Sequence, residues 1–263
     1  MKIGVFTNPN KDAGLKVQKN VFRTATSNGI EAEEFDENGR YSFIVSIGGD
    51  GTILRIAEYC ANTETPILGV NMGTVGFLTE IEPSELDSAF KKLKAREYML
   101  ERRALIDASI GDKHFYALND SVIRTCCGRM ITMQVAINDE LIDKFTCDGY
   151  IACTPTGSTA YSLAAGGSVI GPNTPVIALT PINPHTLRTR PIVVGSFENI
   201  QMKNMGAPDA VVYIDGEERA TLKAGEGMTV TGWDKSALFV RFGNQSFYSR
   251  LLSKLNHWST PEV

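Results

Sequence analysis

Hydrophobic and polar residues follow two different periods over the first hundred positions of the chain. Short apolar runs of the kind that fills a buried parallel strand are expected at residues 2–7, 43–47 and 67–70, with a weaker candidate at 30–35. Apolar side chains recur at helical spacing over residues 12–28 and 83–94. Because strands and helices alternate, the pattern predicts an open, Rossmann-like α/β domain with a parallel sheet.

The pattern changes near residue 98. From there to about residue 242, alternating or β-branched runs are separated by turn pairs, such as the Asn-Asp pair at 138–139 and the Asp-Gly pair at 215–216. A further turn is expected at residues 232–234. Alternating runs with turns of this kind are typical of an all-β unit.

These patterns divide the chain into two domains. We expect an N-terminal α/β domain over residues 1–97 and a β-rich domain over residues 98–245. Residues 246–263 include apolar side chains at helical spacing, and we expect this last helix to pack back on the first domain.

The stretch YSFIVSIGGDGTILRIA, residues 41–57, combines a buried strand, a glycine turn and a helix start. Gly48, Gly49 and Gly51 allow a phosphate to approach the backbone closely, and a helix N-terminus favours negative charge. Thr52 is expected to cap the helix. The turn matches neither a P-loop nor the full dinucleotide fingerprint, but it predicts an anion site.

Asp50 puts a carboxylate in the middle of this turn. A site that only holds phosphate gains nothing from a negative charge, so Asp50 is expected to hold a metal, bind a hydroxyl or accept a proton. The alternative is a turn residue, since Asp-Gly is a common turn pair. Arg55, one turn into the helix, is either a phosphate contact or part of a solvated helix face.

Composition narrows the class of protein. The chain has 263 residues, 43% of them hydrophobic, a net charge of −4 and no apolar run of membrane-spanning length. Five cysteines without zinc spacing, and an N-terminus without the pattern of a signal peptide, favour reduced thiols in a cytoplasmic protein. We expect neither nucleic-acid binding nor membrane association.

Three further segments carry candidate chemistry. In DGYIACTPTGSTAYSLAAGG, residues 148–167, hydroxyls crowd a helix start between Asp148 and Tyr161, which suggests a polar binding wall with an aromatic lid; helix capping is the alternative. Phe77, in NMGTVGFL, is either a core aromatic or a ring stacked on a ligand base. The pair Asn119-Asp120 is a turn unless it faces the other motifs.

Taken together, these segments resemble the NAD kinase family. The similarity rests on GGDGT (48–52), NMGTVGFL (71–78), the Asn-acidic pair (119–120), the long motif (148–167), TPINPHTLRTRPIV (180–193) and IDGE (214–217). It covers most of the chain, and the long motif is highly specific. GGDGT alone is not, because it also occurs in diacylglycerol and sphingosine kinases, and a similar turn occurs in phosphofructokinases.

The resemblance implies a kinase that phosphorylates the adenosine ribose 2′-hydroxyl of NAD with ATP or polyphosphate, giving NADP. It implies a phosphofructokinase-like α/β domain, a β-sandwich-like second domain and a homotetramer. Mg²⁺ or another divalent metal is the expected cofactor, because it offsets the repulsion between the carboxylates and the donor phosphates; no metal-binding side chains are assigned.

The resemblance also suggests roles for individual residues. Asp50 is the expected proton acceptor, next to the phosphate loop of Gly48, Gly49 and Thr52. The expected substrate contacts are Gly51, Arg55, Phe77, Asn119, Asp120, Asp148, Thr156, Thr159, Ala160, Tyr161, Ser162, Leu163, Ala164 and Asn183. The sequence departs from the family pattern at Thr74, Asp120, Thr146 and Glu217.

Two other functions stay open at this point. A non-catalytic NAD(P)-binding regulator would keep the pocket without turnover, although the carboxylate in the glycine turn favours the kinase. A lipid kinase relative would share GGDGT but leave residues 148–167 unexplained. The preference for NAD or NADH, the phosphoryl donor and regulation by NADPH are not determined by the sequence.

Overall fold

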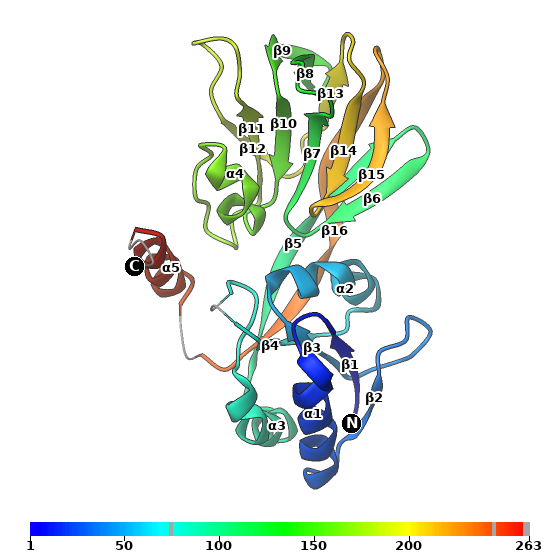
Figure 1. Ribbon diagram of the computed structural model, residues 1–263, viewed down its shortest axis with the longest axis vertical. Helices are drawn as coiled ribbons and strands as arrows, with labels where there is room; N and C mark the ends of the chain where they lie inside the picture. The colour runs from blue at the N-terminus through cyan, green and yellow to red at the C-terminus, as the bar shows by residue number, and fades with distance from the viewer. Residues whose placement is uncertain (74–75, 244–245, 260–263) are drawn as a thin grey trace. The chain divides into compact units, whose positions relative to one another are not determined.

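The computed structural model describes residues 1–73, 76–243 and 246–259, with side chains to residue 253. The chain divides into two compact units, which are Met1–Arg102 with Ala237–Val263, and Arg103–Ser236 (Figure 1). The units therefore meet at 102/103 and 236/237, whereas the sequence pattern places the boundaries at 97/98 and 245/246. Because β5 (Met99–Ile110) and β16 (Gly227–Arg241) run through both points, no loop or composition change marks them.

The first unit contains the expected parallel sheet. Its strands pair in the order β2-β1-β3-β4, with bounds Glu31–Glu34, Lys2–Thr7, Phe43–Gly48 and Ile67–Asn71. The register pairs Val5 with Val45 and Val45 with Leu68, all in parallel. All residues of β3 and β4 are buried, which explains their nearly continuous apolar sequences.

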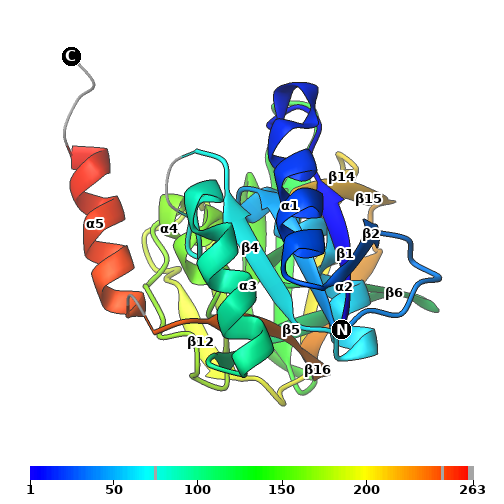
Figure 2. The ribbon, with the colours of Figure 1, turned by 90° about the horizontal axis from the view of Figure 1, so that it is seen from below.

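Helices cover the sheet of the first unit. Neighbouring helices α1 (Lys16–Ser27) and α3 (Leu86–Ala95) pack on one face through an apolar core that includes Val21, Phe90 and Val45 (Figure 2). Gly69 of β4 leaves room for Ile53 of α2 (Asp50–Thr63), because a Cβ at residue 69 would come within 2.9 Å of the Ile53 Cδ1 atom. Short 3₁₀ turns, Ala13–Leu15 and Pro83–Glu85, precede α1 and α3, and α5 spans Phe247–Ser259.

The second unit is a β-sandwich. One sheet has the order β12-β11-β10-β7-β14-β15, with bounds Ile192–Gly195, Val176–Ile182, Gly149–Cys153, Asp120–Thr125, Ala210–Ile214 and Glu217–Leu222. The facing strands are β6 (Lys113–Ala117) beside β5, and β13 (Ile200–Asn204), β8 (Ile131–Ile137) and β9 (Glu140–Cys147), which follow β16 in that order. Apolar side chains from both sheets, such as Ile123, Met133 and Leu179, form one core between them.

Two of the expected turns are present and the third is wrong. Residues 138–139 have positive φ, as do residues 215–216, and each pair joins adjacent antiparallel strands. Strand β16 continues without a break through residues 232–234. Gly232 marks a close backbone approach instead, because its N–H donates to the Ser196 carbonyl at 2.7 Å and a Cβ would lie 2.6 Å from that oxygen.

The membrane expectation can be compared only with the described helices. Within residues 1–73, 76–243 and 246–259, no helix combines the length and the apolar character needed to cross a bilayer.

Candidate functional site

A pocket of about 270 Å³ lies at the carboxyl ends of the parallel strands in the first unit. The glycine turn after β3 forms one wall, and Gly73 and Gly76 form part of another. Asn8 and Lys11, which follow β1, and Asn71, at the end of β4, add polar groups. The pocket therefore joins three strand ends around GGDGT.

The helix N-terminus at this pocket begins at Asp50, with Gly49 in the N-cap position and without a side-chain cap. The expectation that Thr52 caps the helix is therefore wrong. Thr52 is buried in the first turn, and a Cβ on Gly48 would overlap its hydroxyl oxygen. Glycine at position 48 is thus required for the turn to close over Thr52, while the helix dipole still favours an anion in the pocket.

The Asp50 carboxylate is held by the backbone of the segment that follows β4. Its Oδ2 accepts a hydrogen bond from the Phe77 N–H at 2.8 Å, and its Oδ1 accepts one from the Leu78 N–H at 3.0 Å. These two donors fix the orientation of the carboxylate of Asp50, which lines the pocket. The carboxylate is therefore fixed in direction as well as in position.

Asn8, Lys11 and Asn71 were not identified as site residues from the sequence. Lys11 is exposed at the pocket and provides a positive charge beside the helix N-terminus. The Asn71 side chain donates to the Gly73 carbonyl at 2.7 Å, while its buried Oδ1 has no hydrogen-bond partner among the described residues. Their position directly after two buried strands was the signal that could have identified them.

Arg55 and Phe77 do not line this pocket. The Arg55 guanidinium lies 5.6 Å from the centre of the Phe6 ring, and Arg55 does not line the pocket, which favours the solvated-helix alternative for it. Phe77 is 7% exposed, and its ring centre lies 5.9 Å from that of Phe247 in α5. The ring therefore belongs to the core of the first unit.

In the second unit, Asp215 organises the Asn119-Asp120 pair. Its carboxylate accepts hydrogen bonds from the N–H groups of Leu118, Asn119 and Asp120, at 2.8, 2.7 and 3.1 Å. The IDGE segment contributed to the family resemblance, but no role was assigned to Asp215. The Asp-Gly hairpin turn was its only local signal, and the 95 to 97 residues that separate it from its partners explain why it was missed.

Burial raises the pKa values of the Asp120 and Asp215 carboxyl groups. Loss of hydration, with the nearby Asp215 charge as a smaller cause, raises the pKa of Asp120 to about 7. Burial raises the pKa of Asp215 to about 6, although its three N–H donors act in the opposite direction. The pair therefore takes up protons at a pH where isolated carboxyls are ionised.

The hydroxyl-rich motif is mostly turned inward. Thr154 donates to the Leu118 carbonyl, Ser158 donates to the Pro155 carbonyl, and both side chains are fully buried. Thr156 is also buried and accepts a hydrogen bond from Arg103 at 3.4 Å. The expectation of a polar binding wall is therefore wrong for the Thr154 and Ser158 hydroxyls, which fix the fold of the turn.

The rest of this motif lies on the outer face of the β10 sheet. Thr159 ends a 3₁₀ turn, Gly157–Thr159, and the short helix α4 covers Tyr161–Ala164. Ser162 is fully buried, and its hydroxyl lies 2.8 Å from the Thr180 hydroxyl. Tyr161 is half-buried and packs on an apolar cluster that includes Val122 and Ile151. Ala160 and Leu163 are half-buried and Ala164 is exposed, so this segment offers side chains to a ligand.

Asp148 and Asn183 are brought together, with the Asn183 side chain donating to the Asp148 carboxylate at 2.9 Å. They lie at the opposite end of β10 from Asp120, because Asp148 precedes the strand whereas Asp120 pairs with Cys153 at its end. Five residues of strand span roughly 16 Å. The second-unit residues thus form two groups rather than one.

Thr74, Thr146 and Glu217 are three of the positions at which the sequence departs from the family pattern. Thr146 is on β9, where its backbone carbonyl accepts from the His185 N–H, and exposed Glu217 pairs with Arg219 at 2.7 Å. Thr74 lies outside the described residues.

No cluster of three or more His, Cys, Asp or Glu side chains suited to a metal occurs in the described part of the chain.

An α/β unit with a carboxylate at a glycine-turn anion pocket, joined to a β-sandwich with an Asn-Asp pair, defines the class of two-domain nucleotide kinases that use GGDGT. Comparison with known proteins specifies the family. The models described as the ATP-NAD kinase N-terminal and C-terminal domains match residues 31–98 and 118–242. The chain belongs to the NAD kinase family.

Individual relatives agree with this assignment. The NAD kinase of Caldanaerobacter subterraneus subsp. tengcongensis is 36% identical over 97% of this chain and 98% of its own length. The crystal structure of an NAD kinase from Archaeoglobus fulgidus in complex with ATP has a TM-score of 0.81 at 29% identity, covering 97% of this chain and 99% of that one. Yeast NADH kinase complexed with NADH, at 22% identity and a TM-score of 0.84 over 100% of this chain and 89% of that one, shares the fold.

Proposed function

We propose that this protein transfers the terminal phosphoryl group of ATP to the adenosine ribose 2′-hydroxyl of NAD and releases NADP and ADP. The observation that carries the proposal is the Asp50 carboxylate, which two backbone N–H groups fix at a pocket made for anions. Family membership supplies the substrate class.

In the proposed reaction, the ribose 2′-oxygen forms a bond to the terminal phosphorus as the bond to the ADP oxygen breaks. Asp50 orients the 2′-hydroxyl and accepts its proton. A carboxylate cannot pre-form an alkoxide, but a loose phosphoryl-transfer transition state does not require one, because positioning supplies most of the catalysis. The two N–H donors to Asp50 provide that positioning.

The pocket in the first unit suits the donor phosphates. The N-terminus of α2 and the Lys11 ammonium supply positive potential, and the glycines of the turn leave room for close approach. Mg²⁺ bound to the donor phosphates supplies further charge compensation. The unpartnered Asn71 Oδ1 is an oxygen ligand of the type Mg²⁺ accepts, so the residues present fit a cation carried mainly by phosphate oxygens.

The second unit is proposed to hold the nucleosides. Asn119 and Asp120, ordered by Asp215, and the half-buried ring of Tyr161 are the candidate contacts. Asp148 and Asn183 lie too far from them to bind the same sugar, which favours an assembly in which a second copy brings this pair to the ligand. We therefore also propose a homotetramer.

The deciding experiment is an assay of NADP formation from NAD with ATP and Mg²⁺, repeated with polyphosphate as donor. We expect turnover in the wild type and its loss in Asp50→Asn purified in the same way. NAD binding by calorimetry without any NADP formation would identify a non-catalytic regulator and overturn the kinase proposal.

A further inference from the structure

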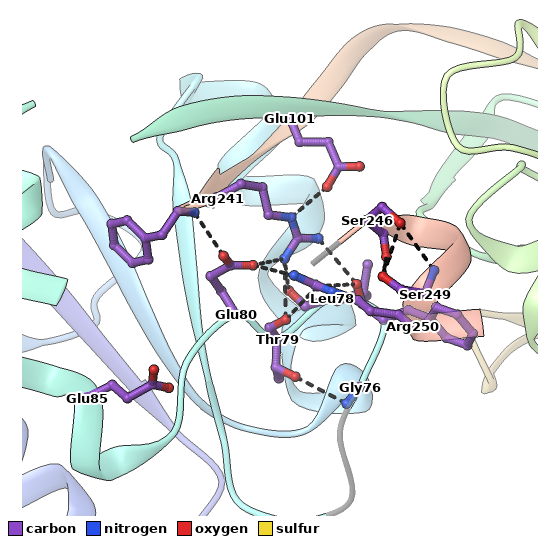
Figure 3. Close-up of polar contacts among 12 residues, drawn as sticks. Gly76, Leu78, Thr79, Glu80, Glu85, Glu101, Arg241, Ser246, Ser249 and Arg250 are labelled. Atoms are coloured by element: carbon purple, nitrogen blue, oxygen red, sulfur yellow. Dashed lines mark hydrogen bonds and ion pairs between the residues drawn. The ribbon is translucent and has the colours of Figure 1, made fainter. Parts of the chain in front are cut away.

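Two buried arginines from the C-terminal part of the chain bind the backbone of residues 77–79. Arg241, at the end of β16, donates to the carbonyls of Phe77, Leu78 and Thr79 at 3.2, 3.1 and 3.3 Å. Arg250, in α5, donates to the carbonyls of Phe77 and Thr79 at 3.3 and 3.0 Å (Figure 3). Both guanidinium groups therefore face the segment that follows β4.

Acidic side chains balance these charges. The Glu80 side chain is 1% exposed, and its Oε2 lies 3.1 Å from the Arg241 Nη1 and 2.6 Å from the Arg250 Nη2. Its Oε1 accepts from the Phe242 N–H at 2.8 Å, and Glu101 pairs with the Arg241 Nε at 2.6 Å (Figure 3). Two basic and two acidic side chains thus compensate one another within the core.

The same backbone segment holds Asp50 from its other side. The carbonyl of Phe77 and the N–H of Leu78 belong to one peptide group, which accepts from both arginines and donates to the Asp50 Oδ1. Hydrogen bonds arranged in a chain polarise one another, and an ionic donor strengthens the effect. A planar peptide also cannot rotate its N–H without moving its carbonyl.

We propose that Arg250, together with Arg241, acts as a positioning residue for catalysis by fixing the peptide that orients the Asp50 carboxylate. The inference rests on the proposed function of Asp50 and adds to it, because it assigns a role in the reaction to the C-terminal helix. Arg250 is separated from its backbone partners by 171 to 173 residues.

The first test is a kinetic double-mutant cycle of Asp50→Asn and Arg250→Ala. We expect Arg250→Ala to lower kcat by about 10- to 100-fold, since a small misplacement of a catalytic group has effects of this size. The KM for NAD should change by less than about threefold, because Arg250 acts through Asp50 rather than on substrate. In the Asp50→Asn background, Arg250→Ala should lower the remaining rate by less than about twofold, because residues that act as a unit are not additive.

Two further variants keep this test interpretable. Arg250→Lys retains a charge beside Glu80 but lacks the fork of donors, so we expect an intermediate kcat; if Arg250→Ala does not fold, this variant carries the cycle. Arg23→Ala is the matched control, because this arginine on α1 is exposed and its guanidinium donates to the Asn20 side chain. An unchanged kcat in Arg250→Ala, an effect on KM alone, or equal losses in both backgrounds would overturn the proposal.

A second readout does not depend on activity. Hydrogen exchange of the Phe77 and Leu78 amides, resolved by NMR, should become faster in Arg250→Lys and in Asp50→Asn than in wild type, whereas Arg23→Ala should leave it unchanged. Unchanged exchange in Arg250→Lys would contradict the positioning role. If the wild type forms no NADP but the exchange responds as expected, the proposed kinase activity fails while the structural link between Arg250 and Asp50 stands.

Discussion

The Cα of Gly76 lies against the carboxylate of Asp50, so closely that a Cβ at position 76 would overlap the Oδ1 atom. The contact brings Asp50 within reach of the two N–H groups that follow, and no residue larger than glycine fits there without displacing the carboxylate. The Asp50 carboxylate therefore explains why position 76, which lies 26 residues later in the sequence, is a glycine.

Gly76→Ala should consequently lower activity. We expect kcat to fall by about 10- to 100-fold, because the added methyl group displaces the Asp50 carboxylate from its two donors. NADP formation at saturating substrates is the measurement. Gly206→Ala is the control, since a Cβ at residue 206 meets no described atom within 4 Å. Wild-type turnover in Gly76→Ala would mean that the position of Asp50 is not critical.

Asp50→Asn should separate binding from chemistry. Loss of a general base typically lowers the rate by ~10²–10⁴-fold, while NAD affinity measured by calorimetry should be retained. Asn has one carbonyl oxygen where Asp50 uses two, so one N–H loses its acceptor and stability should fall by about 1–3 kcal/mol. Turnover within about threefold of wild type would make Asp50 a structural residue only.

The two candidate aromatic contacts should behave differently from each other. Tyr161→Ala should raise the KM for NAD, since loss of a base-stacking ring has an effect of about 1–3 kcal/mol in proteins that bind single-stranded nucleic acids. Phe77→Ala should instead lower the free energy of unfolding by about 3–5 kcal/mol, because this ring is buried against Phe247. Paired melting and kinetic measurements test both; a Phe77→Ala variant that keeps its stability but loses NAD affinity would restore the stacking role.

The buried Asp120 carboxyl predicts a pH-dependent stability of the ligand-free protein. Its folded pKa of about 7 exceeds the usual 3.8, so the stability that its neutral form contributes is complete below pH ~4 and is lost as the pH rises through 7. Asn is neutral at every pH, so Asp120→Asn should melt at least about 2 °C above wild type at pH 8, with a smaller difference at pH 5 because the loss is only partial there.

Asp112→Asn, an exposed carboxyl in the β5–β6 turn, is the control for that comparison and should show no such pH dependence. Melting curves at pH 5, 6, 7 and 8 give the measurement. An Asp120→Asn variant that melts below wild type at pH 8 would show that the carboxylate has partners that compensate its charge.

A homotetramer predicts a particle of about four times 28.7 kDa in light scattering at micromolar protein. The edge strands of the second unit, such as β9 and β15, together with the distance between Asp120 and the Asp148–Asn183 pair, motivate this expectation. A species of single-chain mass throughout the concentration range would exclude it and would leave Asp148 without a place at the site.

The sequence by itself determined the local elements of the first unit and the identity of its central carboxylate. Short apolar runs such as 43–47, bounded by glycines, are typical of buried strands, and the glycines that follow leave one side chain, Asp50, with chemistry to perform. The helix start was misassigned to Thr52 because capping preference is local, whereas Gly48 and the buried Thr52 hydroxyl set the actual start through packing.

Only the tertiary structure decided what holds the site residues. Asp215 gathers the N–H groups of residues 118–120, and Arg250 reaches residues 77–80, across 95 to 173 positions of sequence. Such contacts depend on which strand ends and helices the fold brings together, and a hydrophobic period reports only which face of an element is buried. The buried hydroxyls of Thr154 and Ser158 illustrate the same limit, since a polar residue type does not reveal whether it faces a ligand or its own backbone.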